Sequence, residues 1–276
     1  MLEDQGRGVY TGAIGYIKPN RRAQFSVAIR TLVVDKLADK VTYGVGGGIV
    51  WDSDPHEEWQ ETLDKAAVLK DAYPPFRLLE TMLYQPGVGV RLQDYHLDRL
   101  AHFARHFGFE FQRELDLENI TAFESAQPQR MRLLLGPSGE PEIQATAYPK
   151  VDSVVQLKLA VAPLDCMSPF LFHKTTHRLV YDIARLGQDD CDDVLLWNER
   201  DEITETTIYN IYLEIDGRLF TPPPHSGLFA GVYRRMMLET GKASELPLFK
   251  TDLDRASRIF VSNSVRGLIP AKLILP

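Results

Sequence analysis

The chain has 276 residues, 44% hydrophobic and 25% charged, which is the balance of a soluble globular protein with one large domain or two ordinary ones. Its 31 basic and 38 acidic residues give a net charge of −7, and without a long basic run we expect neither nucleic acid nor a membrane surface as a partner. No apolar run is long enough to span a bilayer, and the first residues lack the basic and apolar parts of a signal peptide, so we expect a cytoplasmic protein.

The two cysteines, Cys166 and Cys191, form neither a disulfide framework nor a CxxC pair. We therefore predict that both are free thiols.

The first seventy residues predict a strand, a hairpin and a helix. Apolar residues alternate from Phe25 to Val33, which indicates one strand, and Asp39-Lys40 turns the chain back. Apolar side chains at helical spacing predict a helix over 57–69. The paired prolines in 71–75 forbid its continuation, so we place a domain boundary there, between residues 1–70 and 76–276.

The remaining residues predict a mixed order of strands and helices, that is, an α+β fold. We expect a helix that Asp94 caps and Gly108 ends, a second helix that Gly187 ends, and a hairpin turn at Asp216-Gly217. The predicted strands cover 78–83, 131–135, 142–147, 155–161, 194–197, 203–206, 210–215 and 219–221, and the second helix covers 176–186.

Three short motifs follow one another in the N-terminal part. They are residues 8–16, with the sequence GVYTGAIGY, then AIRT at 28–31, then GGGIV at 46–50. Taken singly, each has an ordinary explanation: the glycines could be a turn between strands, and Glu61 with Lys65 could be a surface ion pair one helical turn apart.

In combination, the motifs resemble the C-terminal end of the chorismate-utilising enzymes, such as anthranilate synthase and aminodeoxychorismate synthase component I. The resemblance implies that Tyr10 and Arg30 contact the substrate and that Gly46 and Gly48 offer backbone N–H groups to a carboxylate. It also implies that Glu61 is a Mg²⁺ ligand in an incomplete site and that Lys65 lines that site.

The resemblance covers only residues 7 to about 70. The other metal ligand and the catalytic groups of that family lie upstream, so Mg²⁺ would bind only if the site were complete. We expect this segment to be a remnant, and Met1 to be an artificial or misassigned start within a longer fusion.

A second set of motifs begins at Phe76. In chain order these are LETM at 79–82, HLDRL at 96–100, HKTT at 173–176, ITETT at 203–207, GVYR at 231–234 and VSNS at 261–264. They resemble the fold type IV pyridoxal-phosphate enzymes, which include class IV aminotransferases of the D-amino-acid aminotransferase type and 4-amino-4-deoxychorismate lyase. The resemblance implies a small subdomain over 76–164 and a large subdomain over 165–276.

Pyridoxal 5'-phosphate requires an amine that bonds to its aldehyde, an acid that keeps its pyridine nitrogen protonated, and donors for its phosphate. The resemblance assigns the amine to Lys174 and the acid to Glu205. Without it, Lys174 would be an ordinary solvated lysine and Glu205 an ordinary exposed glutamate.

For the phosphate, the resemblance assigns Arg99, the N–H groups of Val232 and Tyr233 at a helix N-terminus, and the hydroxyl of Ser264. Tyr233 replaces a smaller residue, so only its backbone is expected to act. Thr81 could present a hydroxyl to the substrate or could simply be satisfied within a strand.

The resemblance implies conversion of 4-amino-4-deoxychorismate to 4-aminobenzoate and pyruvate, for folate synthesis, by a synthase and lyase fusion. Lys174, assisted by Thr81, would carry the proton. Two alternatives remain: a class IV aminotransferase acting on an α-amino acid, and a truncated, catalytically silent fragment. The expected partners are the small-molecule substrate, a second copy in a homodimer and a glutamine amidotransferase subunit of the full-length fusion.

Overall fold

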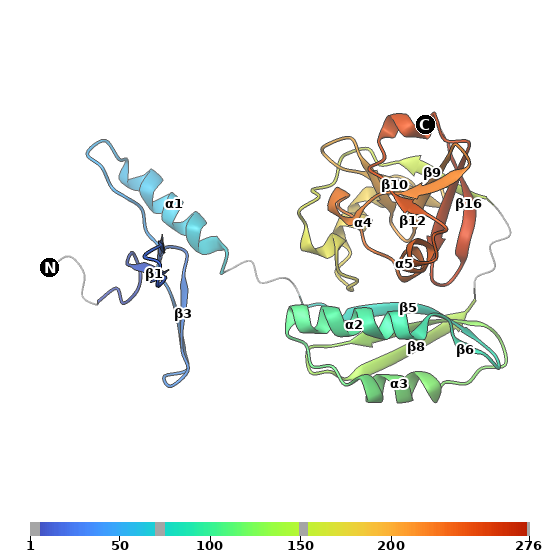
Figure 1. Cartoon of the computed structure of the whole chain (residues 1–276), viewed down its shortest axis with the longest axis horizontal. Coiled ribbons are helices and arrows are strands. Elements are labelled where there is room, and N and C mark those ends of the chain that lie inside the picture. The colour runs from blue at the N-terminus through green and yellow to red at the C-terminus, as the bar shows by residue number, and fades with distance from the viewer. Residues whose placement is uncertain (1–5, 70–74, 149–153, 275–276) are drawn as a thin grey trace. The chain divides into compact units, whose positions relative to one another are not determined.

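The computed structural model describes residues 6–69, 75–148 and 154–274. The chain divides into two compact units, Met1–Pro74 and Pro75–Pro276 (Figure 1). Apart from Pro75, the predicted break at 71–75 lies outside the described residues.

The N-terminal unit consists of two hairpins and a helix. Strands β1 (Ala13–Ile17) and β2 (Ala23–Val27) pair antiparallel, as do β3 (Leu32–Asp35) and β4 (Lys40–Tyr43). Asp39 lies in the second turn with φ +48°, as predicted. Helix α1 (Pro55–Ala67) begins at Asp54, whose carboxylate accepts N–H bonds from its first turn.

The single strand predicted over 25–33 is wrong. The chain leaves the extended conformation after Val27, where Arg30 adopts φ +49° and the N–H of Ile29 donates to the carbonyl of Val27. The alternation of apolar residues continues across this turn, so the pattern concealed the break.

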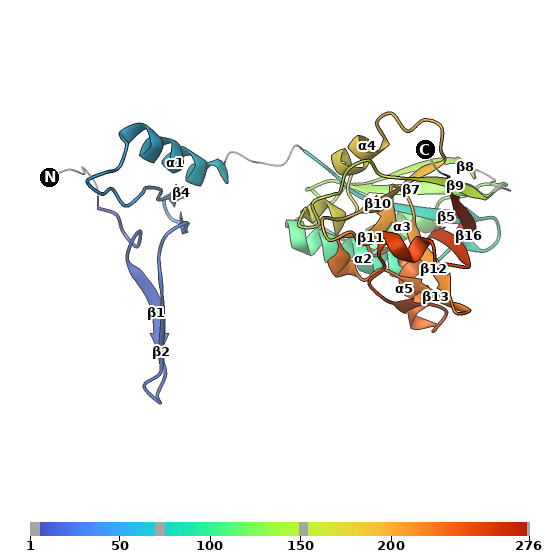
Figure 2. The same ribbon diagram turned by 90° about the horizontal axis from the view of Figure 1, so that it is seen from above.

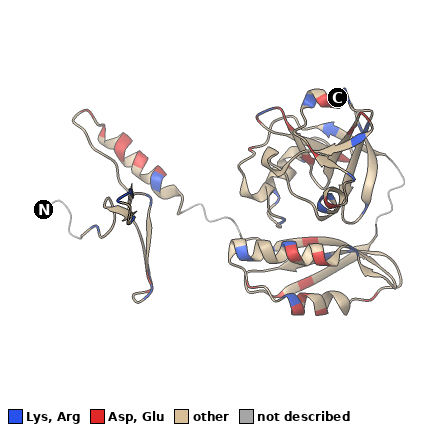
Figure 3. Ribbon diagram, viewed as in Figure 1, with Lys and Arg blue, Asp and Glu red and all other residues tan. Residues whose placement is uncertain are grey.

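Apolar side chains of this unit are largely exposed. Among its described residues, only Ala28 is a buried hydrophobic residue, whereas Phe25 is 57% and Trp51 is 99% exposed. Acidic side chains lie along α1, and Lys65 lies in its last turn (Figure 3). The described part of this unit therefore forms secondary structure without a hydrophobic core.

The C-terminal unit contains a four-stranded antiparallel sheet in the order β6-β5-β7-β8. Its strands are β5 (Leu78–Gln85), β6 (Gly89–Val90), β7 (Gln129–Leu135) and β8 (Pro141–Ala147). Helices α2 (Gln93–Phe107) and α3 (Arg113–Thr121) share a core with one face of this sheet, which includes Met82, Leu100, Ile120 and Leu133.

The second sheet has eight strands in the order β11-β10-β9-β16-β15-β12-β13-β14. An additional pairing between β11 and β12 closes six of them into a barrel. The strands are β9 (Val155–Leu159), β10 (Asp193–Trp197), β11 (Ile203–Thr206), β12 (Asn210–Ile215), β13 (Arg218–Thr221), β14 (Ser244–Glu245), β15 (Arg258–Asn263) and β16 (Gly267–Leu273).

Helices α4 (Leu179–Arg185) and α5 (Val232–Glu239) accompany this sheet, and short 3₁₀ helices cover Pro169–Leu171, Pro224–Ser226 and Lys250–Leu253. The four-stranded sheet lies below the barrel in Figure 1, and the two overlap when viewed from above in Figure 2. This arrangement confirms the predicted α+β, two-subdomain fold. Both cysteines are free, as predicted. In the described ranges, no helix is long and apolar enough to span a membrane.

Several local predictions need correction. Asp94 lies in the first turn of α2 rather than at its cap, which is Leu92 in a left-handed conformation, whereas Gly108 ends the helix as predicted. Helix α4 begins at Leu179 rather than at 176, because residues 174–176 bond to the start of β5.

The subdomain boundary predicted at 164/165 is also misplaced. Strand β9 pairs in parallel with β10 and β16, so it belongs to the second sheet. Such pairing joins segments far apart in the sequence, and strands β15 and β16 were not predicted. Helix α3 was not predicted either.

Candidate active site

A cavity of about 250 Å³ in the C-terminal unit brings the predicted cofactor residues together. Its lining comes from both sheets and includes Thr81, Arg99, Lys174, Glu205, Val232 and Ser264. Of the predicted cofactor residues, only Tyr233 does not line it.

Lys174 is held at the cavity by backbone bonds to the four-stranded sheet. Its carbonyl accepts the N–H of Leu79 at 3.0 Å, and the next residue, Thr175, forms a β-bridge with Leu78. The ammonium lies 5.2 Å from the ring centroid of Phe229. Burial, together with the positive charges of Arg99 and Arg178, lowers the pKa of Lys174 to about 7. A large fraction of this amine is therefore neutral and nucleophilic at neutral pH.

Glu205 is a buried acid in β11, next to the closure of the barrel. Its Oε1 accepts both the hydroxyl of Tyr181, at 2.9 Å, and the N–H of Phe229, at 2.8 Å. Burial raises the pKa of Glu205 to about 8, even though these two bonds act in the opposite direction. Both donors use Oε1, and no described residue donates to Oε2, so this second oxygen remains for a partner in the cavity.

Arg99 from α2 is fixed by a carboxylate that the sequence analysis did not single out. Glu80 is fully buried and accepts from Nε of Arg99 at 2.8 Å, from a terminal nitrogen of Arg99 at 2.5 Å and from Nδ1 of His96 at 2.6 Å. Burial alone would raise the pKa of Glu80, but the charge of Arg99 and these hydrogen bonds lower it to about 2.

The guanidinium of Arg99 also reaches the segment that precedes α5. Its other terminal nitrogen donates to the carbonyl of Ala230 at 3.2 Å. Arg99 thus stands beside the N-terminus of α5, where the first N–H groups have no acceptor within the helix. The two features together make a site for an anion.

The entry to α5 requires a glycine at 231. Its N–H donates to Oδ1 of Asn210 at 3.1 Å, and a Cβ at this position would lie 2.1 Å from that oxygen. Beyond it, the guanidinium of Arg91 lies over the ring of Tyr233, 5.0 Å from the ring centroid, and Tyr233 does not line the cavity.

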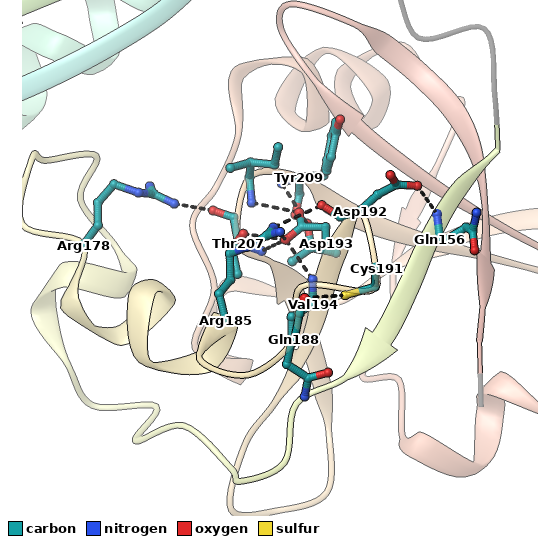
Figure 4. A network of polar contacts seen from close by, with 12 residues as sticks. Gln156, Arg178, Arg185, Gln188, Cys191, Asp192, Asp193, Val194, Thr207 and Tyr209 are labelled. Atoms are coloured by element: carbon teal, nitrogen blue, oxygen red, sulfur yellow. Dashed lines mark hydrogen bonds and ion pairs between the residues drawn. The ribbon is translucent and has the colours of Figure 1, made fainter. Parts of the chain in front are cut away.

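Asp193, at the start of β10, organises the turn that follows Glu205 (Figure 4). Its buried carboxylate accepts the hydroxyls of Thr206 and Thr207, at 2.6 and 2.5 Å, and pairs with Arg185 at 3.2 Å. It also accepts the N–H groups of Val194, Thr207 and Ile208. Thr207 and Ile208 line the cavity, so Asp193 positions part of its wall.

In the N-terminal unit, some of the predicted residues come together. The Lys65 ammonium pairs with Glu61 at 2.8 Å and donates to the carbonyl of Gly46 at 3.1 Å. The hydroxyl of Tyr10 lies 3.0 Å from where a Cβ on Gly46 would stand.

Arg30 and Gly48 are exposed. Within the described ranges, no three His, Cys, Asp or Glu side chains converge as a metal site. Glu61 pairs with Lys65 in this structure, and its role as a Mg²⁺ ligand of an incomplete site stays a prediction.

A barrel against a four-stranded sheet, with a lysine and a buried glutamate facing one cavity between them, is the arrangement of fold type IV pyridoxal-phosphate enzymes. The family model for class IV aminotransferases matches residues 77–274, and the chain belongs to this family.

The C-terminal unit has relatives with different names. A proposed aminodeoxychorismate lyase from Schizosaccharomyces pombe is 28% identical over 210 residues, which cover 72% of this chain and 90% of that protein. The crystal structure of a proposed amino-acid aminotransferase from Mesorhizobium loti is 40% identical with a TM-score of 0.68, and the match covers 72% of this chain and all of that one. The two names differ in the reaction.

The N-terminal unit matches a second family model, chorismate binding enzyme, over residues 1–71. Anthranilate synthase component 1 of Cereibacter sphaeroides is 47% identical over 72 residues, and an aminodeoxychorismate synthase of Streptomyces griseus is 44% identical over 80. These matches span only 14% and 10% of those two proteins. Together, the two family matches confirm the predicted fusion of a chorismate-binding segment with a class IV unit.

The family implies pyridoxal phosphate, and the residues of the cavity fit it. Within the described residues, the amine of Lys174 forms no ion pair. The second oxygen of Glu205 suits a pyridine nitrogen, and Arg99 with the N-terminus of α5 suits a phosphate. The chain is therefore an enzyme with a pyridoxal-phosphate site.

Proposed function

We propose that this chain converts 4-amino-4-deoxychorismate to 4-aminobenzoate and pyruvate. The observation that carries the proposal is that Lys174, whose pKa is lowered, and the buried acid Glu205 line one cavity. The other segment of the same chain resembles chorismate-binding enzymes. The S. pombe relative, named as an aminodeoxychorismate lyase, supports the same reaction.

When bound, pyridoxal phosphate supplies an aldehyde that bonds to amines and a protonated ring that accepts electrons. Glu205 would hold the ring-nitrogen proton with its free oxygen. Arg99, the N–H groups of Val232 and Tyr233, and the hydroxyl of Ser264 would bind the phosphate. Glu205 is fixed by Tyr181 and Phe229, and Arg99 by Glu80 and Ala230, which reduces the cost of orienting these two side chains.

Lys174 is the natural carrier of the proton that leaves the substrate carbon bearing the amine, because its pKa of about 7 suits both acceptance and return of a proton. Thr81 lies on the cavity face of β5, opposite Arg132 of β7, and its hydroxyl would assist. Loss of pyruvate then leaves an aromatic ring, which makes the elimination effectively irreversible.

A class IV aminotransferase is the second candidate, and the 40% identity to the M. loti protein favours it. The two reactions separate in one assay. Release of pyruvate and 4-aminobenzoate from 4-amino-4-deoxychorismate without a keto-acid acceptor supports the lyase. Turnover of an α-amino acid that requires an acceptor, with no pyruvate from the chorismate derivative, would establish the aminotransferase instead.

The third reading, a catalytically silent fragment, predicts that the chain neither binds the cofactor nor turns over either substrate. A visible absorption band after reconstitution with pyridoxal phosphate would show that the chain binds the cofactor and so contradict this alternative. The homodimer and the glutamine amidotransferase subunit stay predictions, which sedimentation and co-purification can test.

A further inference from the structure

One wall of the cavity is rich in arginine. Arg130 and Arg132 alternate with the buried Met131 and Leu133 along β7, so both point away from the core and toward the cavity that they line. Arg178, just before α4, lines the cavity from the other subdomain.

Two of these three guanidinium groups have neutral hydrogen-bond partners. Nε of Arg130 donates to the hydroxyl of Thr146 at 3.2 Å, and Arg178 donates to the carbonyl of Thr207. In the described part of the chain, none of the three forms an ion pair with an acid, although Arg77, Arg113, Arg234 and Arg258 all do.

The cavity offers little negative charge in return. Among the described residues, Glu205 is the one acid that lines it, and Tyr181 and Phe229 already bind one of its oxygens. Burial, followed by the positive charges of Arg130 and Arg178, lowers the pKa of Arg132, so Arg132 carries its charge against two neighbouring cations.

We propose that Arg130, Arg132 and Arg178 form a subsite that selects substrates carrying two carboxylates. The proposal rests on the proposed function, since 4-amino-4-deoxychorismate is such a dianion. Guanidinium groups bind carboxylates through paired N–H donors, and crowded cations in a partly closed cavity gain most from a ligand with more than one negative charge.

The same wall opposes other substrates. A branched apolar side chain would leave the guanidinium groups desolvated and unpaired, and a single carboxylate would neutralise only part of their charge. The subsite therefore also explains how a class IV fold would reject branched-chain amino acids.

The test uses chorismate as the probe, because it has both carboxylates but a hydroxyl in place of the amine and so cannot bond to the cofactor. Calorimetric titration of the holoenzyme should show chorismate binding about tenfold or more tighter than benzoate, which has one carboxylate. Arg132→Met should weaken chorismate binding by about tenfold or more and erase most of this preference. The chorismate affinity of Arg132→Lys should lie between those of the wild type and Arg132→Met. Arg132→Lys replaces the methionine variant if that variant fails to retain cofactor.

Two controls locate the binding. Arg255→Met, at an exposed arginine that pairs with Asp252 outside the cavity, should leave chorismate affinity unchanged. Arg30→Met tests the chorismate-type segment of the other unit. Chorismate affinity that is lost with Arg30→Met and kept with Arg132→Met would overturn the subsite, as would equal affinity for chorismate and benzoate.

The result stays separate from the reaction assay. Selective, Arg132-dependent binding of chorismate without pyruvate release from 4-amino-4-deoxychorismate would reject the lyase and keep a dicarboxylate-selective site. Pyruvate release together with equal affinity for chorismate and benzoate would keep the lyase and reject the dicarboxylate-selective site.

Discussion

The two units of this chain differ in how sequence identity to known proteins relates to the packing of the unit. The N-terminal unit is 47% identical to its relative over 72 residues, yet its described part buries a single apolar residue and exposes side chains such as Phe25 and Trp51. The C-terminal unit is only 28% identical to the S. pombe protein over 210 residues, but it has a closed barrel, extensive cores and a lined cavity. High identity over a short segment preserves motifs, whereas a working site also needs the packed frame that fixes its side chains.

If this contrast is right, replacing single polar side chains of the C-terminal unit should have large effects on cofactor attachment or stability. The largest is expected for Lys174→Ala, which should abolish covalent attachment of the cofactor completely while changing the melting temperature little, because a lysine whose amine faces a cavity contributes little to packing. Borohydride reduction and peptide mapping measure the attachment. Lys242→Ala, at an exposed position, is the control, and a label on another lysine would show that the site is assigned wrongly.

Asp193→Asn should come next. The amide replaces one acceptor oxygen with a donor that faces other donors, and it removes the ion pair with Arg185, so we expect a loss of about 3 kcal/mol in the free energy of unfolding. Urea denaturation measures it. Asp192→Asn is the matched control on the neighbouring exposed residue, where the cost should stay below about 1 kcal/mol. Equal costs at the two positions would contradict the organising role of Asp193.

Glu205 should make the apoprotein less stable as the pH rises from 5 to 7. Its folded pKa of about 8 lies above its ordinary value, so in this range the folded chain holds a proton that the unfolded chain has released. Stability should therefore fall by up to about 1.4 kcal/mol per pH unit from this group alone. Lys174, with a pKa of about 7, stays largely protonated in both states below that pH and adds little slope.

The measurement is denaturant unfolding at pH 5, 6 and 7 for the wild type and Glu205→Gln. The glutamine variant should lack this part of the slope, while Glu118→Gln, at an exposed glutamate, should keep it. Identical slopes for wild type and Glu205→Gln would mean that Glu205 is ionised in the folded apoprotein.

The smallest effect is expected in the N-terminal unit. Glu61 is largely exposed and pairs with Lys65 one helical turn away, an interaction of a few tenths of a kcal/mol. We predict no chorismate amination by this chain with Mg²⁺ and ammonia, and no change in either stability or lyase turnover on Glu61→Gln. Amination that depends on chorismate and Mg²⁺ and is lost in Glu61→Gln would show that the segment still assembles a working site.

Sequence reasoning predicted the residues whose chemistry the cofactor dictates, and it predicted elements with strong local signals. Gly108 ends α2 with φ +69°, and Asp216-Gly217 makes the hairpin between β12 and β13. These features depend on a few neighbouring residues, so a motif contains enough information to find them.

What it missed depends on contacts between distant segments. Glu80 stands beside Thr81 in a quoted motif, but its role follows from α2, which brings Arg99 and His96 to it. Asp193 looks like one acid among several before a strand, and only the fold places it under the Thr206-Thr207 turn. The alternation of Arg130 and Arg132 with apolar residues was a usable signal, since two arginines on one face of a half-buried strand need an explanation.

The most direct test of the account measures pyruvate and 4-aminobenzoate from 4-amino-4-deoxychorismate for the wild type, Lys174→Ala and Glu61→Gln, with no keto acid and with Mg²⁺ chelated. We predict equal amounts of the two products from the wild type and from Glu61→Gln at the same rate, and none above background from Lys174→Ala. Turnover that needs Mg²⁺, Glu61 or a keto-acid acceptor, or that survives in Lys174→Ala, would contradict the claim that the C-terminal unit alone contains the complete lyase site.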